Sequence, residues 1–130
     1  MLVHFPLVLW LSTPVFDLLC LRFGVAPWWR LSLGVSTLGV AIGVFALMTG
    51  LLDYIELSDT GSNDVRLAAR HGVRTAVVWC AMSIKVLVAW WSHSGPNIVW
   101  WSLIVDSLAS ALLLQGAYFG TKITYGGYGR

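Results

Sequence analysis

A stretch of 22 residues without a charged side chain, Leu31 to Leu52, is the feature that most limits how this chain can fold. As an α-helix it would be about 33 Å long, enough to cross the hydrocarbon core of a bilayer. Of the 130 residues 58% are hydrophobic and 11% are charged, and the mean hydropathy is +0.77. Soluble domains carry roughly 25% charged residues. The sequence therefore predicts an integral membrane protein.

Three further hydrophobic segments accompany this one, and we expect an all-α, integral membrane four-helix bundle that forms a single domain over residues 1–130. In the first span Pro14 has no N–H, so it should kink the helix or free a carbonyl that neighbours must satisfy. The expected spans are about 2–23, 31–54, 71–92 and 98–119. The expected connections are an interfacial turn at 24–30, a hydrophilic segment at 56–69 with a short surface helix from Asn63, a tight turn at 93–97 and a glycine-rich tail at 120–130.

An even number of spans places both termini and the hydrophilic segment on one face, which we call side A, and the two short turns on side B. Side A has five basic residues and side B has two, which favours a cytoplasmic side A. Six of the eight tryptophans fall at side B, as in an aromatic belt. The net charge of +2, without a basic stripe, argues against a nucleic-acid partner. The basic residues are Arg66, Arg70, Arg74, Lys122 and Arg130 on side A, and Arg22 and Arg30 on side B.

Three charged residues from three different spans share one depth inside the membrane. Asp17, Lys85 and Asp106 lie roughly 9, 10 and 12 Å from side B at the rise of an α-helix. An unpaired charge at this depth costs a few kcal/mol or more, so such residues usually face the bundle interior and pair. We expect an intramembrane ionic cluster in which Lys85 binds Asp106, Asp17 or both, as a structural link or as a proton relay. The alternative is that Lys85 extends to side B and both carboxyls are neutral.

A second polar layer is expected at side A, where His4 enters the first span and His71 enters the third. Two imidazoles at similar depth can hold one haem iron between them, and Arg70 and Arg74 could bind its propionates. The alternative is a histidine–carboxylate network without a cofactor, in which His71 pairs with Asp53. Other polar residues expected around this layer are Thr49, Asp53, Gln115 and Tyr118.

Gly39, Gly43 and Gly50 fall on one stripe of the second span. Small residues at this spacing allow close approach of a helix of the same chain, a second chain or a flat cofactor, and all three readings stay open. The sequence contains no C-x-x-C, no H-E-x-x-H and no phosphate-binding glycine loop. We therefore expect no independent catalytic activity, although the sequence leaves the question of an enzyme open.

Several short motifs follow one another along the chain: Val3-His4-Phe5-Pro6, Asp17, Thr49-Gly50-Leu51-Leu52-Asp53, Ala69-Arg70-His71, Gly116-Ala117-Tyr118-Phe119-Gly120 and Tyr125-Gly126-Gly127-Tyr128-Gly129. In this order they resemble the bacterial four-helix membrane family known as domain of unknown function 2231. The resemblance covers essentially the whole chain and implies remote kinship with four-helix b-type cytochromes, and so a haem b or a quinone, with His4, Asp53 and His71 as the matching positions. Arg74 departs from the family pattern, in which an asparagine is expected. So does the pair at 121–122, where a glycine and an acidic residue are typical.

Three functions follow as hypotheses. The first is a small electron-transfer subunit that binds one b-type haem and passes electrons between quinol and a partner protein. The second is a non-catalytic accessory subunit of a larger membrane complex, or a homo-oligomer. The third is a proton-coupled transporter for a small solute that uses the ionic cluster. For all three, the bacterial cytoplasmic (inner) membrane is the expected location, with the lipid bilayer as a partner and both termini in the cytoplasm.

Overall fold

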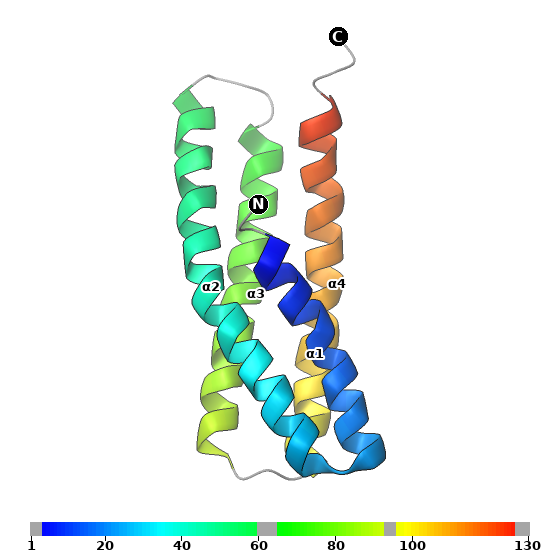
Figure 1. The fold of residues 1–130 in the computed structure, drawn as a ribbon. Helices are drawn as coiled ribbons and strands as arrows, with labels where there is room; N and C mark the ends of the chain where they lie inside the picture. Colours follow the sequence, from blue (N-terminus) through cyan, green and yellow to red (C-terminus); the bar gives the residue numbers. More distant parts are fainter. Residues whose placement is uncertain (1–3, 60–64, 93–95, 127–130) are drawn as a thin grey trace.

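A computed structural model describes residues 4–59, 65–92 and 96–126, and these residues form four α-helices that run up and down one bundle (Figure 1). Helix α1 packs against α2 and α4, and α3 packs against the same two helices from the other side. The described residues contain no strand. The predicted all-α four-helix bundle is therefore confirmed. The helices are α1 (His4–Phe23), α2 (Val25–Asp59), α3 (Val65–Trp91) and α4 (Pro96–Gly126).

Each helix contains a segment that is long and apolar enough to cross a membrane: Phe5–Phe23, Pro27–Asp59, Ala68–Trp91 and Asn97–Tyr118. Large apolar side chains are exposed along all four helices, which suits a surface that contacts lipid. Several polar residues, by contrast, are fully buried between the helices. They are Thr13, Asp17, Ser32, Ser36, Lys85, Ser102 and Asp106.

The expected interfacial turn at 24–30 is wrong, because α2 already begins at Val25. Gly24 alone separates α1 from α2. Its φ of 104° lies in the left-handed region that glycine adopts without strain, and its N–H donates to the Cys20 carbonyl at 3.1 Å. Pro27 falls in the first turn of α2, where its missing N–H interrupts no helical hydrogen bond.

The helices are also longer than expected at side A. Helix α2 continues to Asp59, α3 begins at Val65 and α4 continues to Gly126, so the expected tail is helical over residues 120–126. Extending an existing helix fixes one residue for each new hydrogen bond and therefore needs no new nucleation. The described part of 56–69 is helical too. Residues 60–64, 93–95 and 127–130, which include much of the expected turn at 93–97, lie outside the described part of the chain.

Pro14 does free a carbonyl, as expected. Helix α1 continues through Pro14, and the carbonyl four residues earlier, that of Trp10, accepts a hydrogen bond from the Thr13 hydroxyl at 2.8 Å. The hydroxyl replaces the N–H that proline lacks.

The glycine stripe is occupied by indole rings of the same chain. A Cβ added at Gly39 would lie 2.8 Å from Cδ1 of Trp10, and one added at Gly43 would lie 2.7 Å from Cδ1 of Trp79. Nothing lies within 4 Å of such an atom at Gly50. Of the three readings, close packing inside the monomer is the one that the structure contains. Gly39 and Gly43 therefore give no support to a second chain or a flat cofactor.

Candidate functional site

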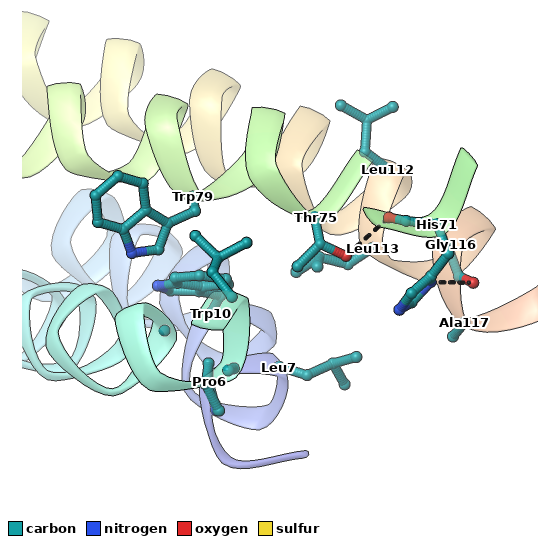
Figure 2. A pocket seen from close by; sticks show the side chains of 13 residues that line it. Pro6, Leu7, Trp10, His71, Thr75, Trp79, Leu112, Leu113, Gly116 and Ala117 are labelled. Carbon is teal, nitrogen blue, oxygen red and sulfur yellow. Dashed lines mark hydrogen bonds between the residues drawn. The ribbon is translucent and has the colours of Figure 1, made fainter. Parts of the chain in front are cut away.

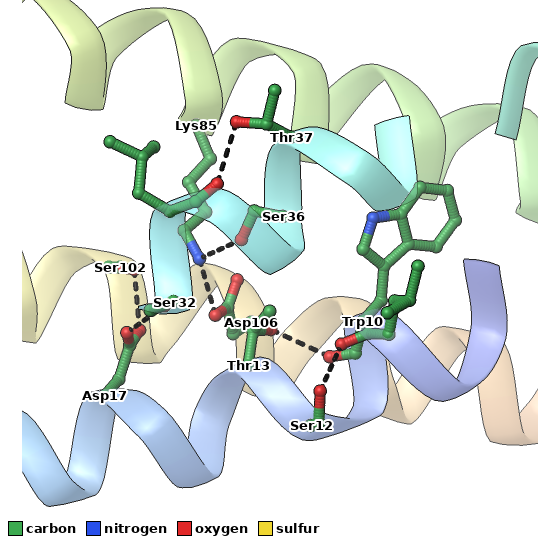
Figure 3. Close-up of polar contacts among 12 residues, drawn as sticks. Trp10, Ser12, Thr13, Asp17, Ser32, Ser36, Thr37, Lys85, Ser102 and Asp106 are labelled. Atoms are coloured by element: carbon green, nitrogen blue, oxygen red, sulfur yellow. Dashed lines mark hydrogen bonds and ion pairs between the residues drawn. The ribbon is translucent and has the colours of Figure 1, made fainter. Parts of the chain in front are cut away.

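The ionic cluster, drawn in Figure 3, lies nearer to the side-B ends of the helices, as the position of Asp17 six residues before the end of α1 indicates. The ammonium of Lys85 donates to Oδ2 of Asp106 at 2.6 Å and to the Ser36 hydroxyl at 3.1 Å. Lys85 is 1% exposed, and Asp106 and Ser36 are 0% exposed. The ion pair that the sequence suggested between spans three and four is thus present, and it is sealed from lipid and from water.

Asp17 is held separately by hydroxyl groups. Ser32 donates to Oδ1 at 2.5 Å and Ser102 donates to Oδ2 at 2.6 Å, distances typical of charge-assisted O–H···O⁻ bonds. Asp17 and both serines are 0% exposed. Among the described residues Lys85 bonds only to Asp106 and Ser36, so the expected link to Asp17 is not present as a direct contact.

The sequence reasoning missed the four hydroxyl residues, although a signal exists. On three helices the polar residues of the cluster come in pairs four positions apart, the spacing that places both on one face of a helix. The hydroxyls of Ser32, Ser36 and Ser102 satisfy carboxylate and ammonium valences that a lone ion pair would leave open, whereas the Thr13 hydroxyl bonds to the Trp10 carbonyl. The pairs are Thr13 and Asp17, Ser32 and Ser36, and Ser102 and Asp106.

Two apolar clusters close off the charges from both sides of the membrane. On side A lies the cluster of Trp10, Val78, Met82, Ala109 and Leu113. On side B lies the cluster of Cys20, Trp29, Ala89 and Val99. All nine residues are buried, so the described conformation is occluded in both directions.

One oxygen of the cluster lacks a hydrogen-bond donor. Oδ1 of Asp106 is buried and has no partner among the described residues. Thr13 lies beside it (Figure 3), but a hydroxyl has a single hydrogen, and that of Thr13 is directed to the Trp10 carbonyl. Oδ1 is therefore the open position of the cluster.

His71 lies in the other half of the bundle, at a small cavity (Figure 2). Its Nδ1 lies 3.0 Å from the Gly116 carbonyl oxygen. A carbonyl only accepts, so Nδ1 carries the hydrogen and a neutral ring keeps its lone pair on Nε2. The cavity has a volume of about 40 Å³ and is lined mainly by apolar groups of all four helices, with Leu7, Trp10 and Trp79 among them.

The other residues expected around His71 do not line this cavity. Thr49 is exposed and bonds to carbonyls of its own helix, and Asp53 and Gln115 are exposed as well. Tyr118 is 57% exposed. His71 thus bonds to a backbone carbonyl instead of the Asp53 carboxylate. The side chain of His4, the other expected ligand, lies outside what the structure describes.

Arg70 and Arg74 line a different concavity, on the surface of α3 together with Ala69 and Val73. The two arginines and His71 were expected around one haem, and the structure places them at two separate sites. No group of three or more His, Cys, Asp or Glu side chains that could hold a metal ion occurs in the described residues.

The described residues fit a haem in one respect and not in another. His71 offers a ring nitrogen whose tautomer suits iron ligation, since ligating histidines usually donate their other N–H to a carbonyl or carboxylate. The cavity of about 40 Å³ is far smaller than ligand sites of roughly 300–1,000 Å³. A porphyrin or a quinone ring therefore does not fit the cavity as described.

The helices, their lipid-facing surface and the buried charges define a four-span membrane protein with an ionic core. The family model described as "Predicted membrane protein (DUF2231)" matches residues 1–128, and the chain belongs to this family. The resemblance found in the sequence motifs is thereby confirmed over nearly the whole chain. The family description gives the membrane class and assigns neither a haem nor electron transfer. No curated protein and no solved structure matches the chain.

Proposed function

We propose that this protein binds one proton at the ionic cluster and exchanges it with one membrane surface, as part of a proton-coupled membrane process. One observation carries the proposal. Two carboxylates, Asp17 and Asp106, face a single ammonium, that of Lys85, in a region where all three side chains are 0–1% exposed. Fully ionised, the cluster would carry one uncompensated negative charge.

Such a charge is expensive inside a membrane protein. Removing an ion from water costs several kcal/mol even after the protein relaxes. Where hydroxyl groups solvate the ion, as they do here, this cost is on the order of 5 kcal/mol or less. One proton on either carboxyl removes the excess charge while the pair with Lys85 is kept. Cys20, three residues beyond Asp17 on α1, is the other titratable group buried nearby, and a thiol is neutral unless it loses its proton. The arrangement therefore favours a bound proton.

The hydrogen bonds distinguish two positions for this proton. On Asp106 it would occupy Oδ1, the open oxygen, and the acid could donate to the oxygen of Thr13. On Asp17 it would require Ser32 or Ser102 to rotate its hydroxyl and accept a bond instead of donating one. Movement of the proton between the two carboxyls would leave the net charge of the cluster unchanged.

Exchange with water requires that one of the two apolar clusters opens, because both cover the charges in the described conformation. Opening of one cluster while the other stays closed lets the proton exchange with one membrane surface without a continuous leak across the membrane. The cavity beside His71, with a volume of about 40 Å³, accommodates water and not a sizeable solute. We therefore assign the proton, and no solute, to this chain.

Infrared spectroscopy of the protein in lipid vesicles tests the proposal, because a protonated carboxyl has a C=O band that a carboxylate lacks. We expect this band at neutral pH, its loss in either Asp17→Asn or Asp106→Asn, and a downshift after transfer to D₂O. Asp53→Asn, which changes an exposed carboxyl of α2, is the matched control and should retain the band.

Two results would reject the proposal. A wild-type protein without the band at neutral pH has no bound proton in its interior. A band that stays unshifted after many hours in D₂O belongs to a static network that exchanges nothing with water.

Electron transfer between quinol and a partner protein through one haem b is the second candidate. The observation that favours it is the bond from His71 Nδ1 to Gly116, which leaves Nε2 available as an axial ligand. The haem would supply one-electron chemistry, and this candidate requires a larger space beside His71 than the structure describes.

A reduced-minus-oxidised absorption spectrum of protein made with haem supplementation tests this candidate. Stoichiometric haem with a b-type band that His71→Ala abolishes supports it, with Thr49→Val as a control for an exposed residue of α2 at side A. Colourless wild-type protein rejects it.

For the location we propose the bacterial cytoplasmic membrane, with side A in the cytoplasm. The excess of basic residues at side A supports this orientation. Paired reporter fusions at the C-terminus, one active only in the cytoplasm and one only outside it, should show activity of the cytoplasmic reporter alone.

A further inference from the structure

Two arginines of α3, the exposed Arg70 and the half-buried Arg74, form a basic site at the surface of the helix. Arg70 and Arg74 are four residues apart, which places neighbouring side chains on one face of a helix about 6 Å apart at Cβ. With Ala69 and Val73 they line a shallow surface concavity of about 300 Å³. His71, between them in sequence, faces the bundle interior instead.

The depth of the two arginines is that of lipid headgroups and the adjoining acyl chains. The segment of α3 that is long and apolar enough to cross a membrane begins at Ala68. At the rise of an α-helix Arg70 lies roughly 3 Å and Arg74 roughly 9 Å beyond that residue. A guanidinium cannot lose its charge at this depth, so an anion beside it is strongly favoured.

The chain itself supplies no such anion to Arg70. Its guanidinium makes no ion pair with any described residue, and the ion pair found among the described residues joins Lys85 to Asp106. Asp53 on α2 is exposed, and no ion pair joins it to Arg70 in the described structure.

The surface on the membrane side of the arginines is apolar. Val73 is 63% exposed and Val77, one turn deeper on the same face, is 51% exposed. A ligand that fills this surface carries an anionic group at one end and a hydrocarbon chain at the other. A free inorganic anion would match the first part only.

We infer that Arg70 and Arg74 bind the phosphate of an anionic phospholipid whose acyl chain lies over Val73 and Val77. Guanidinium groups pair with phosphate oxygens through two parallel N–H···O bonds, which a lysine does not reproduce. The site lies on the outer face of α3 and is independent of the ionic cluster, so failure of the proton proposal would leave it intact.

Native mass spectrometry measures this binding directly. Full-length protein in detergent is mixed with equal amounts of phosphatidylglycerol and phosphatidylcholine, and the ratio of bound lipids is recorded. We expect enrichment of the anionic lipid in the wild type, a reduction of about fivefold in Arg70→Gln and of about 25-fold in the double variant with Arg74→Gln, given about 1 kcal/mol for each charge. Arg70→Lys should fall between wild type and Arg70→Gln.

The matched control is the double variant Arg22→Gln with Arg30→Gln, which removes two exposed arginines at the other end of the bundle. It should keep the wild-type lipid ratio. An equal loss of anionic-lipid enrichment in both double variants would show that the preference depends only on net charge, and this would overturn the proposal.

Two further outcomes would also overturn it. One is the absence of any preference for the anionic lipid in the wild type. The other is displacement of the lipid by millimolar inorganic phosphate, which would assign the site to a free anion. If the double variant does not fold, the single variants Arg70→Gln and Arg70→Lys still decide the question, since Arg70 is exposed and outside the core.

Discussion

Replacement of Lys85 by methionine keeps an unbranched side chain that is one atom shorter and removes the charge, so it isolates the ion pair inside the bundle. In the wild type the ammonium lies 2.6 Å from Oδ2 of Asp106 and 3.1 Å from the Ser36 hydroxyl. The Lys85→Met protein would leave Asp106 without its main donor in a site that is 0% exposed.

The magnitude follows from the burial of both partners. Removing one member of a buried ion pair costs about 3–5 kcal/mol, because the remaining charge is left without compensation. Removing both members costs much less, since position 106 then carries no charge and Asp17 keeps its two serine partners. We therefore expect Lys85→Met to lower the free energy of unfolding by about 4 kcal/mol, and addition of Asp106→Asn to restore at least about 2 kcal/mol of it.

Protonation adds a pH dependence to this prediction. Without Lys85 no cation compensates the buried carboxyls, so on the proposed function the folded cluster binds one proton more than in the wild type, whereas the unfolded chain leaves its carboxyls ionised near neutral pH. The folded Lys85→Met protein thus binds more protons than its unfolded state, so its stability falls as pH rises and the deficit shrinks on acidification.

Reversible unfolding by sodium dodecyl sulfate in mixed micelles, followed by circular dichroism, measures all four proteins of the double-mutant cycle. Glu56→Gln, at an exposed carboxyl of α2, is the control and should match the wild type. Additive losses from the two single substitutions would show that Lys85 and Asp106 are not energetically coupled, and the reasoning from their contact would then be refuted.

Two further predictions concern Trp10. Gly39→Ala places a methyl group against the Trp10 ring and should lower the free energy of unfolding by about 1–3 kcal/mol in the same assay. Gly50→Ala, whose added Cβ would have nothing within 4 Å, should be neutral or slightly stabilising. Equal effects of the two substitutions would contradict the packing of Trp10 on α2. Thr13→Val removes the donor to the Trp10 carbonyl and should cost about 1–3 kcal/mol in the same assay. Ser12→Ala is the control and should cost less. It removes a hydroxyl bonded to the Leu9 carbonyl, but the residue four positions after Leu9 is not a proline.

The level of the ionic cluster could be predicted from the sequence because depth in a membrane is nearly one-dimensional. Counting residues from the span ends placed Asp17, Lys85 and Asp106 at one height, and the structure brings Lys85 and Asp106 into contact. Which carboxylate Lys85 binds could not be predicted. That choice depends on how each helix is rotated about its axis, and rotation is set by packing against neighbours.

The surroundings of His71 could not be predicted for a different reason. Its partner is the carbonyl of Gly116, and every residue of the chain has such an oxygen, so no side-chain pattern marks it. The prediction of an interfacial turn at side B was wrong because only Gly24 interrupts the helical conformation there, whereas the Trp-rich residues after it were expected to lie outside a helix. Both errors concern backbone geometry, which composition does not encode.

A proton bound at the off-centre cluster, as proposed, would respond to the membrane voltage with a slope that depends on which face of the bundle is open. Asp17 lies six residues before the end of α1, roughly 9 Å into a hydrocarbon core of about 30 Å. A unit charge that crosses the whole membrane gains about 2.3 kcal/mol per 100 mV. A proton from side B would cross about a third of the field and change its occupancy about threefold per 100 mV. A proton from side A would cross the remaining two thirds of the field in the opposite direction, and its occupancy would change more than tenfold per 100 mV. The sign and slope of the voltage response therefore identify the open face.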